Sequence, residues 1–129
     1  MTVRIVRLGD DRFPDEGLRI GTVRRPPRGV PKDEYAARNI YDVWLPNLAP
    51  SESLLKQALA AEGEREWKAF LRKYRAEMKA PEASRVLDTL AALSHQTNFS
   101  VGCYCREERR CHRSVLRELL NARDADVAD

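Results

Sequence analysis

Val101-Gly-Cys-Tyr-Cys-Arg-Glu-Glu-Arg-Arg-Cys-His-Arg113 is the stretch of this 129-residue chain that decides its fold. Apolar residues lead into it, and the residues that follow, from Val115 to Leu120, are apolar at helical spacing. The pattern predicts a buried strand over 98–105, a charged loop, and a helix over 110–122. All three cysteines and one of the two histidines of the chain lie in this stretch, which makes it the strongest candidate for a functional site.

Strands are predicted near both ends of the chain, around a helical middle. The residue pattern favours a strand at a sheet edge over 2–8, a second strand over 18–23, and either a strand or an irregular segment over 39–45. Because the last strand feeds directly into a helix, parallel pairing is favoured. The chain is therefore expected to be one compact α/β domain over residues 1–129, with a small mixed or parallel sheet flanked by helices.

The helical middle is marked by apolar stripes and by breaking residues. One stripe, at 67, 70, 71, 74 and 78, recurs at helical spacing and is expected to pack in the core. The helices are expected over 31–38, 51–63, 64–80 and 82–94. The end of the chain, about 122–129, is acidic.

The composition is that of an ordinary globular protein with a charged surface. The formal net charge is +3, and no apolar run approaches the ~20 residues that span a membrane. No signal peptide is recognisable at the N-terminus, so we expect a cytoplasmic protein without a membrane partner, in which the cysteines are reduced thiols.

Basic residues are concentrated in two segments, each of which follows a predicted strand. Five lie between Arg19 and Lys32 without an acidic residue, and five arginines lie between Cys103 and Arg117. Open α/β sheets bind ligands outside the carboxyl ends of their strands, so parallel neighbouring strands would bring both segments to one crevice. We therefore predict that a phosphate-bearing small molecule or nucleotide is bound there, with the ligand residues Arg24, Arg28 and Arg113.

A nucleic-acid-binding module is the alternative use of the same arginines. The modest net charge and the lack of an aromatic platform for bases count against it. A third hypothesis is a thiol-redox or metal-binding protein.

The thiols themselves support three interpretations. Cys111, near a helix N-terminus and several arginines, is the predicted reactive thiol, and His112 is its predicted acid or base partner, which would make the pair catalytic. Cys103 and Cys105 lie two apart on a predicted strand, which places both thiols on one face, and with Cys111 and His112 they make a formal set of three cysteines and one histidine. A metal site is nevertheless not expected, because neighbouring helical residues point ~100° apart, so that Cys111 and His112 would share one ion only with difficulty, and because the paired two-residue spacing of zinc modules is absent. No cofactor is predicted. Chemically inert, buried cysteines are the third interpretation.

Several segments resemble the YeaO-like proteins, a family of unknown function. The similarity is carried by Gly17-Leu-Arg-Ile-Gly-Thr-Val-Arg24 with Pro27-Arg-Gly29, by the aromatic stripe, and by the ending Cys111-His-Arg113, which resembles the Cys-His-Arg motif of the wider family. Val23 and Pro26 stand where YeaO-like chains usually have an aspartate and an aromatic residue. The resemblance implies an intracellular α/β domain and no particular reaction.

Overall fold

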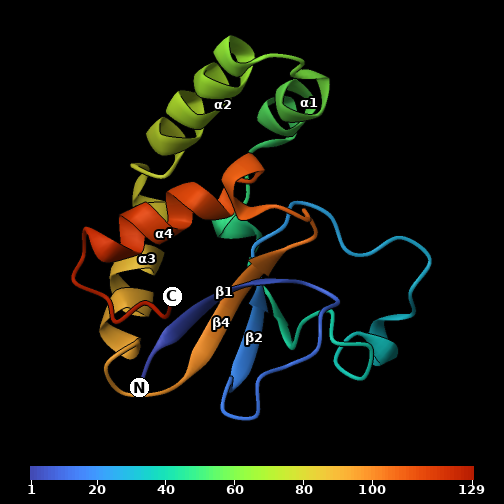
Figure 1. Cartoon of the computed structure of the whole chain (residues 1–129), viewed down its shortest axis with the longest axis vertical. Helices are drawn as coiled ribbons and strands as arrows, with labels where there is room; N and C mark the ends of the chain where they lie inside the picture. Colours follow the sequence, from blue (N-terminus) through green and yellow to red (C-terminus); the bar gives the residue numbers. More distant parts are fainter.

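A four-stranded, fully parallel sheet forms the centre of the molecule in the computed structural model, which describes residues 1–129 (Figure 1). The strand order is β1-β4-β2-β3, and the expected α/β fold is confirmed. The strands are β1 (Val3–Arg7), β2 (Leu18–Gly21), β3 (Val43–Trp44) and β4 (Phe99–Cys103).

β4 is the central strand, although it comes last in the chain. All five of its residues are buried, and Phe99 pairs with Val3 of β1 on one side and with Leu18 of β2 on the other. A strand that is covered on both faces needs a continuous apolar or small sequence, which Phe99-Ser-Val-Gly-Cys103 provides. β1 lies at the edge, as predicted, and 39–45 contains only the two-residue edge strand β3.

Four α-helices surround one side and one end of the sheet. Figure 1 shows α3 and α4 beside the sheet, with the α1–α2 hairpin extending beyond the end at which the strands finish. The predicted stripe of α2 is confirmed, since Trp67, Phe70, Tyr74 and Met78 are buried. The helices are α1 (Glu52–Ala60), α2 (Glu64–Glu77), α3 (Pro81–Leu93) and α4 (Arg113–Asn121).

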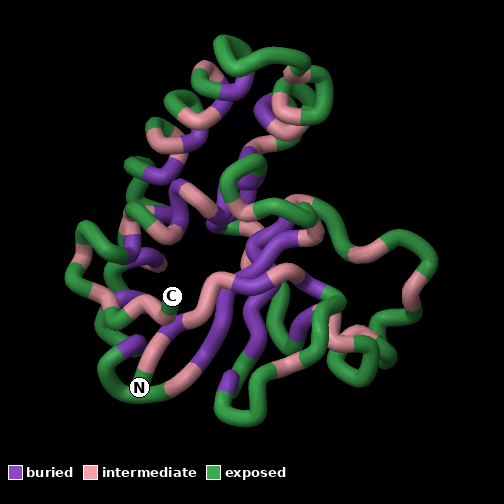
Figure 2. The backbone as a smooth tube through the Cα atoms, viewed as in Figure 1, coloured by how far each residue is buried: buried purple, intermediate pink, exposed green.

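The two faces of the sheet are buried by different means. Ile20 and Val101 pack with the helices in the main apolar core. Arg19 and Ser100, which alternate with them along the strands, are also fully buried, beneath the loops that precede and follow β2. Buried residues consequently run along the whole length of β4 and along β2 after Leu18, while most of the surrounding loop residues are exposed or half-buried (Figure 2).

Two of the predicted helices differ from the structure. The segment 31–38 forms only the 3-10 turn Lys32–Glu34 followed by turns. The last helix begins at Arg113 and not at residue 110, because the 3-10 turn Glu108–Arg110 is followed by Cys111 in an extended conformation (φ −144°, ψ 154°). This break in the helical path turns the Cys111 side chain into the protein, where it is only 1% exposed.

The acidic end of the chain is tied to the sheet. Val127 forms a parallel bridge with Val3, and the backbone N–H of Val3 donates to the carbonyl of Asp126. The chain end therefore covers the free edge of β1. None of the helices has the length and apolar composition that crossing a membrane requires.

Candidate functional site

A cavity of about 350 Å³ opens at the carboxyl ends of β2 and β4. Because these strands are parallel neighbours, the loops that follow them meet at one end of the sheet, as the sequence predicted. Arg24 and Arg25 line the cavity from the first loop, and Cys103, Cys105, Cys111 and His112 line it from the second. Ten of the fifteen lining residues are hydrophobic, several of them on the α1–α2 hairpin, so a ligand with an apolar part fits this cavity.

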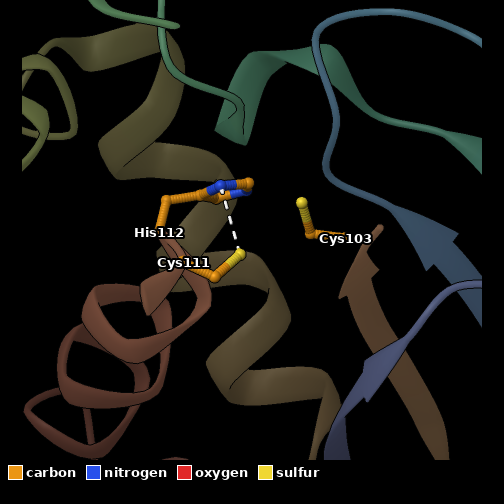
Figure 3. Close-up of side chains that lie close together, drawn as sticks. All are labelled: Cys103, Cys111 and His112. Atoms are coloured by element: carbon orange, nitrogen blue, oxygen red, sulfur yellow. Dashed lines mark hydrogen bonds between the residues drawn. The ribbon is translucent and has the colours of Figure 1, made fainter. Parts of the chain in front are cut away.

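Two of the three thiols and the imidazole converge at this cavity, where the side chains of Cys103, Cys111 and His112 lie close together (Figure 3). Cys103 is the last residue of β4, while Cys111 and His112 directly precede α4. The ligand atoms of these three residues all lie within 4.8 Å of one another. Cys105, which is exposed, has its Sγ 3.8 Å from that of Cys103. The cysteines are therefore one cluster, defined by residues 103, 105, 111 and 112, which we call the thiol cluster.

The tautomer of His112 follows from its hydrogen bonds. Its Nε2 lies 2.8 Å from the carbonyl oxygen of Thr22, which only accepts, so Nε2 carries the proton. Burial lowers the pKa of His112 to about 4, against the opposing effect of the Thr22 bond, so the ring is neutral near pH 7. Nδ1 therefore presents a lone pair, and it lies 3.7 Å from the Sγ of Cys111.

The thiols differ in how readily they ionise. Hydrogen bonds with Cys105 and Cys111, together with burial, raise the pKa of Cys103. Hydrogen bonds with the other two thiols lower the pKa of Cys105, and the charge of Arg113 lowers it further. The bond with Cys103 lowers the pKa of Cys111, but the bond with Cys105 and burial raise it by more, to about 11. Cys105 is thus the thiol that ionises first.

Arg113 is buried behind the thiol cluster and has no carboxylate partner. It is 3% exposed, its Nη2 donates to the carbonyl of Cys105 at 2.7 Å, and its Nε has no hydrogen-bond partner. A buried cation without a counter-ion is costly, and the charge of Arg113 favours the thiolate of Cys105. Arg113 does not line the cavity, so its position suits charge balance for the cluster better than direct contact with a ligand.

The other predicted anion ligands take different positions. Arg24 lines the cavity, but its Nε and Nη2 donate to the carbonyls of Pro46, Ala49 and Pro50, which tie the loop after β2 to the segment before α1. Arg28 is exposed and lies outside the cavity lining. The structure therefore brings Arg24, Cys111 and His112 to one cavity and leaves Arg28 and Arg113 off its lining.

Two arginines at the cavity were not among the predicted ligands. Arg25 pairs with Glu52 at 2.7 Å, and Arg110 pairs with Glu64 at 3.2 Å and lies over the ring of Trp67. Both ion pairs are exposed, and exposed pairs contribute little to stability, so these arginines are free to exchange partners. Only the tertiary structure identifies them, because both belong to charged runs in which every arginine looks alike.

The expectation that Cys111 and His112 point too far apart to share an ion rests on a wrong premise. It places both residues in a helix, whereas Cys111 is extended and His112 is the residue before α4. Cys103 and Cys105 belong to the formal ligand set considered in the sequence, but not to the predicted catalytic or ligand-binding residues. The structure brings Cys103 close to Cys111 and His112, and Cys105 close to Cys103.

Comparison with known proteins identifies relatives over nearly the whole chain. Residues 3–124 match the family model DUF488-N3a, described as "Active DUF488-N3 subclade". Uncharacterized proteins from Mycobacterium bovis and Mycobacterium tuberculosis are 31% identical over 121 residues, which is 94% of this chain and 95% of theirs. No solved structure gives a significant match. The expected membership of a family of unknown function is confirmed, whereas the narrower assignment to the YeaO-like proteins stays a prediction.

Proposed function

The chain belongs to the DUF488-N3a family, and from that premise we propose that it is a thiol-dependent enzyme acting on a small anionic molecule in the cavity above the thiol cluster. One observation carries the proposal: a single cavity is lined by three thiols, a neutral imidazole and several arginines. The family description calls its subclade active, which supports a catalytic use of these side chains.

Cys105 is the proposed nucleophile. It is the exposed member of the cluster, it lines the cavity, and its neighbours Cys103 and Cys111 stabilise its thiolate. In the proposed step, its sulfur forms a bond to an electrophilic atom of the substrate, and the leaving group departs with the electron pair of the broken bond. The proton that Cys105 loses passes by way of the Cys111 thiol to the lone pair on Nδ1 of His112, and the same predicted pair returns it to the leaving group.

The substrate class follows from the lining of the cavity. A volume of about 350 Å³ lies in the range of small-molecule sites, and the mostly hydrophobic lining suits an apolar or planar body. Arg25 and Arg110, whose ion pairs are exposed, supply charge for an anionic group. A phosphate-bearing small molecule or nucleotide combines both features, and arginine binds phosphate in a bidentate manner.

Alkylation by iodoacetamide tests this proposal. In reduced, chelator-treated protein we expect Cys105 to be alkylated faster than free cysteine at pH 6, because its thiolate is stabilised, and faster than Cys103 and Cys111, which are buried. The labelled residues are identified by mass spectrometry of peptides. Inorganic phosphate and adenosine monophosphate are then added, and they are expected to slow the labelling of Cys105.

The variant Arg110→Gln is expected to weaken this protection, whereas Arg109→Gln, an exposed neighbour outside the cavity, leaves it unchanged. Labelling of Cys105 no faster than that of free cysteine contradicts the thiol chemistry. Labelling that neither phosphate compound slows contradicts the substrate class.

A further inference from the structure

Two separations within the thiol cluster match those of a tetrahedral metal site. Tetrahedral zinc with bonds of about 2.3 Å to sulfur and about 2.0–2.1 Å to nitrogen places neighbouring sulfurs about 3.8 Å apart, and a sulfur and a nitrogen about 3.6 Å apart. The Sγ atoms of Cys103 and Cys105 are 3.8 Å apart, and the Sγ of Cys111 is 3.7 Å from Nδ1 of His112. Figure 3 shows the side chain of Cys103 directed toward this pair from the opposite side.

His112 is oriented as metal-binding histidines are. Its Nε2–H donates to the carbonyl of Thr22 at 2.8 Å, and the edge of Tyr74 packs against the ring. A backbone carbonyl that accepts a hydrogen bond from one ring nitrogen fixes the tautomer and leaves the other nitrogen free to bind a metal. Metal-bound histidines usually have such a hydrogen bond on their second nitrogen. The lone pair on Nδ1 faces the sulfurs.

Charge balance at Arg113 favours the same ligand set. Three thiolates and a neutral imidazole around a divalent cation leave one net negative charge. Arg113 is buried against this cluster without a carboxylate, and its Nη2 binds the carbonyl of Cys105. The guanidinium would therefore neutralise the complex in a region where an unpaired charge of either sign is costly.

We propose that Cys103, Cys105, Cys111 and His112 bind one thiophilic divalent cation, Zn²⁺, as a closed four-ligand site. Three thiolates and one imidazole in tetrahedral geometry select zinc over the oxygen-preferring cations. The proposal uses the side chains of the proposed thiol enzyme but does not depend on its being an enzyme. A closed site would occupy the thiolate of Cys105, so the zinc-bound chain is expected to resist alkylation.

Cobalt substitution is the test. Reduced wild-type protein is titrated with Co²⁺ under anaerobic conditions, and the expected result is a thiolate-to-cobalt absorption band that saturates at one ion per chain and disappears when Zn²⁺ is added. Changes next to a metal ligand typically cost about 10- to 100-fold in affinity, so loss of a ligand is expected to cost at least that. Cys111→Ser and His112→Gln are the ligand variants.

His95→Gln is the matched control, because His95 is the only other histidine and is exposed, with its ring near the carbonyl of Asp124. Circular dichroism establishes that each variant is folded. Absence of the band from wild-type protein overturns the proposal, and so does wild-type cobalt affinity in both folded ligand variants.

A second measurement needs no variant. Zn²⁺ added to wild-type protein is expected to abolish the labelling of Cys105 by iodoacetamide, and unchanged labelling at saturating Zn²⁺ overturns the site. The outcomes separate the two proposals. Fast labelling without cobalt uptake contradicts the metal site alone, whereas cobalt uptake with slow labelling of the metal-free protein contradicts the thiol enzyme alone.

Discussion

Arg19 and Glu16 form a fully buried ion pair on the face of the sheet opposite the helices. Nε of Arg19 lies 2.7 Å from Oε2 of Glu16, and the hydroxyl of Ser100 on β4 donates to the same oxygen. Burial raises the pKa of Glu16, but the hydrogen bonds from Arg19 and Ser100 lower it by more, so the carboxylate stays ionised. This pair links the loop before β2 to the central strand, and so helps to hold together the strands whose ends carry the site.

The substitution Arg19→Met is expected to be strongly destabilising. It leaves the Glu16 carboxylate buried without its partner, and breaking one side of a buried pair costs about 3–5 kcal/mol. Arg25→Met is the matched control, since it breaks an Arg–Glu pair whose side chains are both 53% exposed, and it should change the unfolding free energy far less. Urea unfolding of both variants measures the difference, and equal losses of unfolding free energy would contradict the role given to the buried pair.

At the scale of single elements, β4 positions the site because it is both central and tightly packed. Gly102 lies between Val101 and Cys103, and a Cβ at this position would meet the carbonyl oxygen of Val6 and the side chain of Leu8, both at 2.8 Å. The absence of a side chain here lets β1 and β4 approach each other, and it fixes where Cys103 emerges at the end of the strand.

The substitution Gly102→Ala is therefore expected to destabilise the protein by about 1–3 kcal/mol through overpacking and to displace Cys103. Gly63→Ala, at a site where a Cβ meets nothing within 4 Å, is the steric control; because Gly63 is the N-cap of α2, where alanine is less favourable than glycine, it should cost less than about 1 kcal/mol. Thermal unfolding measures both variants. The same stability for Gly102→Ala as for wild type would show that β1 and β4 have room to separate.

At the scale of the whole molecule, the two chain ends complete the sheet together. Val127 pairs with Val3 of β1, the carbonyl of Ala128 accepts a hydrogen bond from Arg117, and the N–H of Asp126 donates to Ser94. An uncovered strand edge offers unpaired backbone groups to other chains. The end of the chain thus protects the edge of β1 while its acidic side chains face outward.

Removal of residues 125–129 is expected to lower the melting temperature and to promote association at high concentration, because it uncovers β1 and removes several hydrogen bonds worth about 0.5–1.5 kcal/mol each. Light scattering and thermal unfolding measure these effects. The control replaces Asp124, Asp126 and Asp129 by asparagine, which removes the charge and keeps the backbone. If this control behaves like the truncation, the loss of charge repulsion, and not the uncovered edge of β1, causes the association.

The local pattern of apolar residues in the sequence was sufficient to predict most of the helices and strands. The stripe from Trp67 to Met78 identified α2, and the apolar run before Cys103 identified the buried strand β4. The strand-to-helix order also indicated parallel pairing, and parallel β2 and β4 placed their two loops at one cavity. These features depend on residues close together in the chain, where side-chain periodicity reflects burial directly.

The tertiary structure decided what the individual residues of the site do. Nothing in the sequence distinguishes the three predicted anion ligands. In the structure, Arg24 donates to backbone carbonyls, Arg28 is exposed, and Arg113 is buried beside the thiol cluster. The sequence by itself located the thiol cluster in the chain and gave the α/β class. Only the folded chain brings Cys103 and His112 close together. The extended conformation of Cys111 just before α4 and the pairing of β4 with its two neighbouring strands decide where these side chains point.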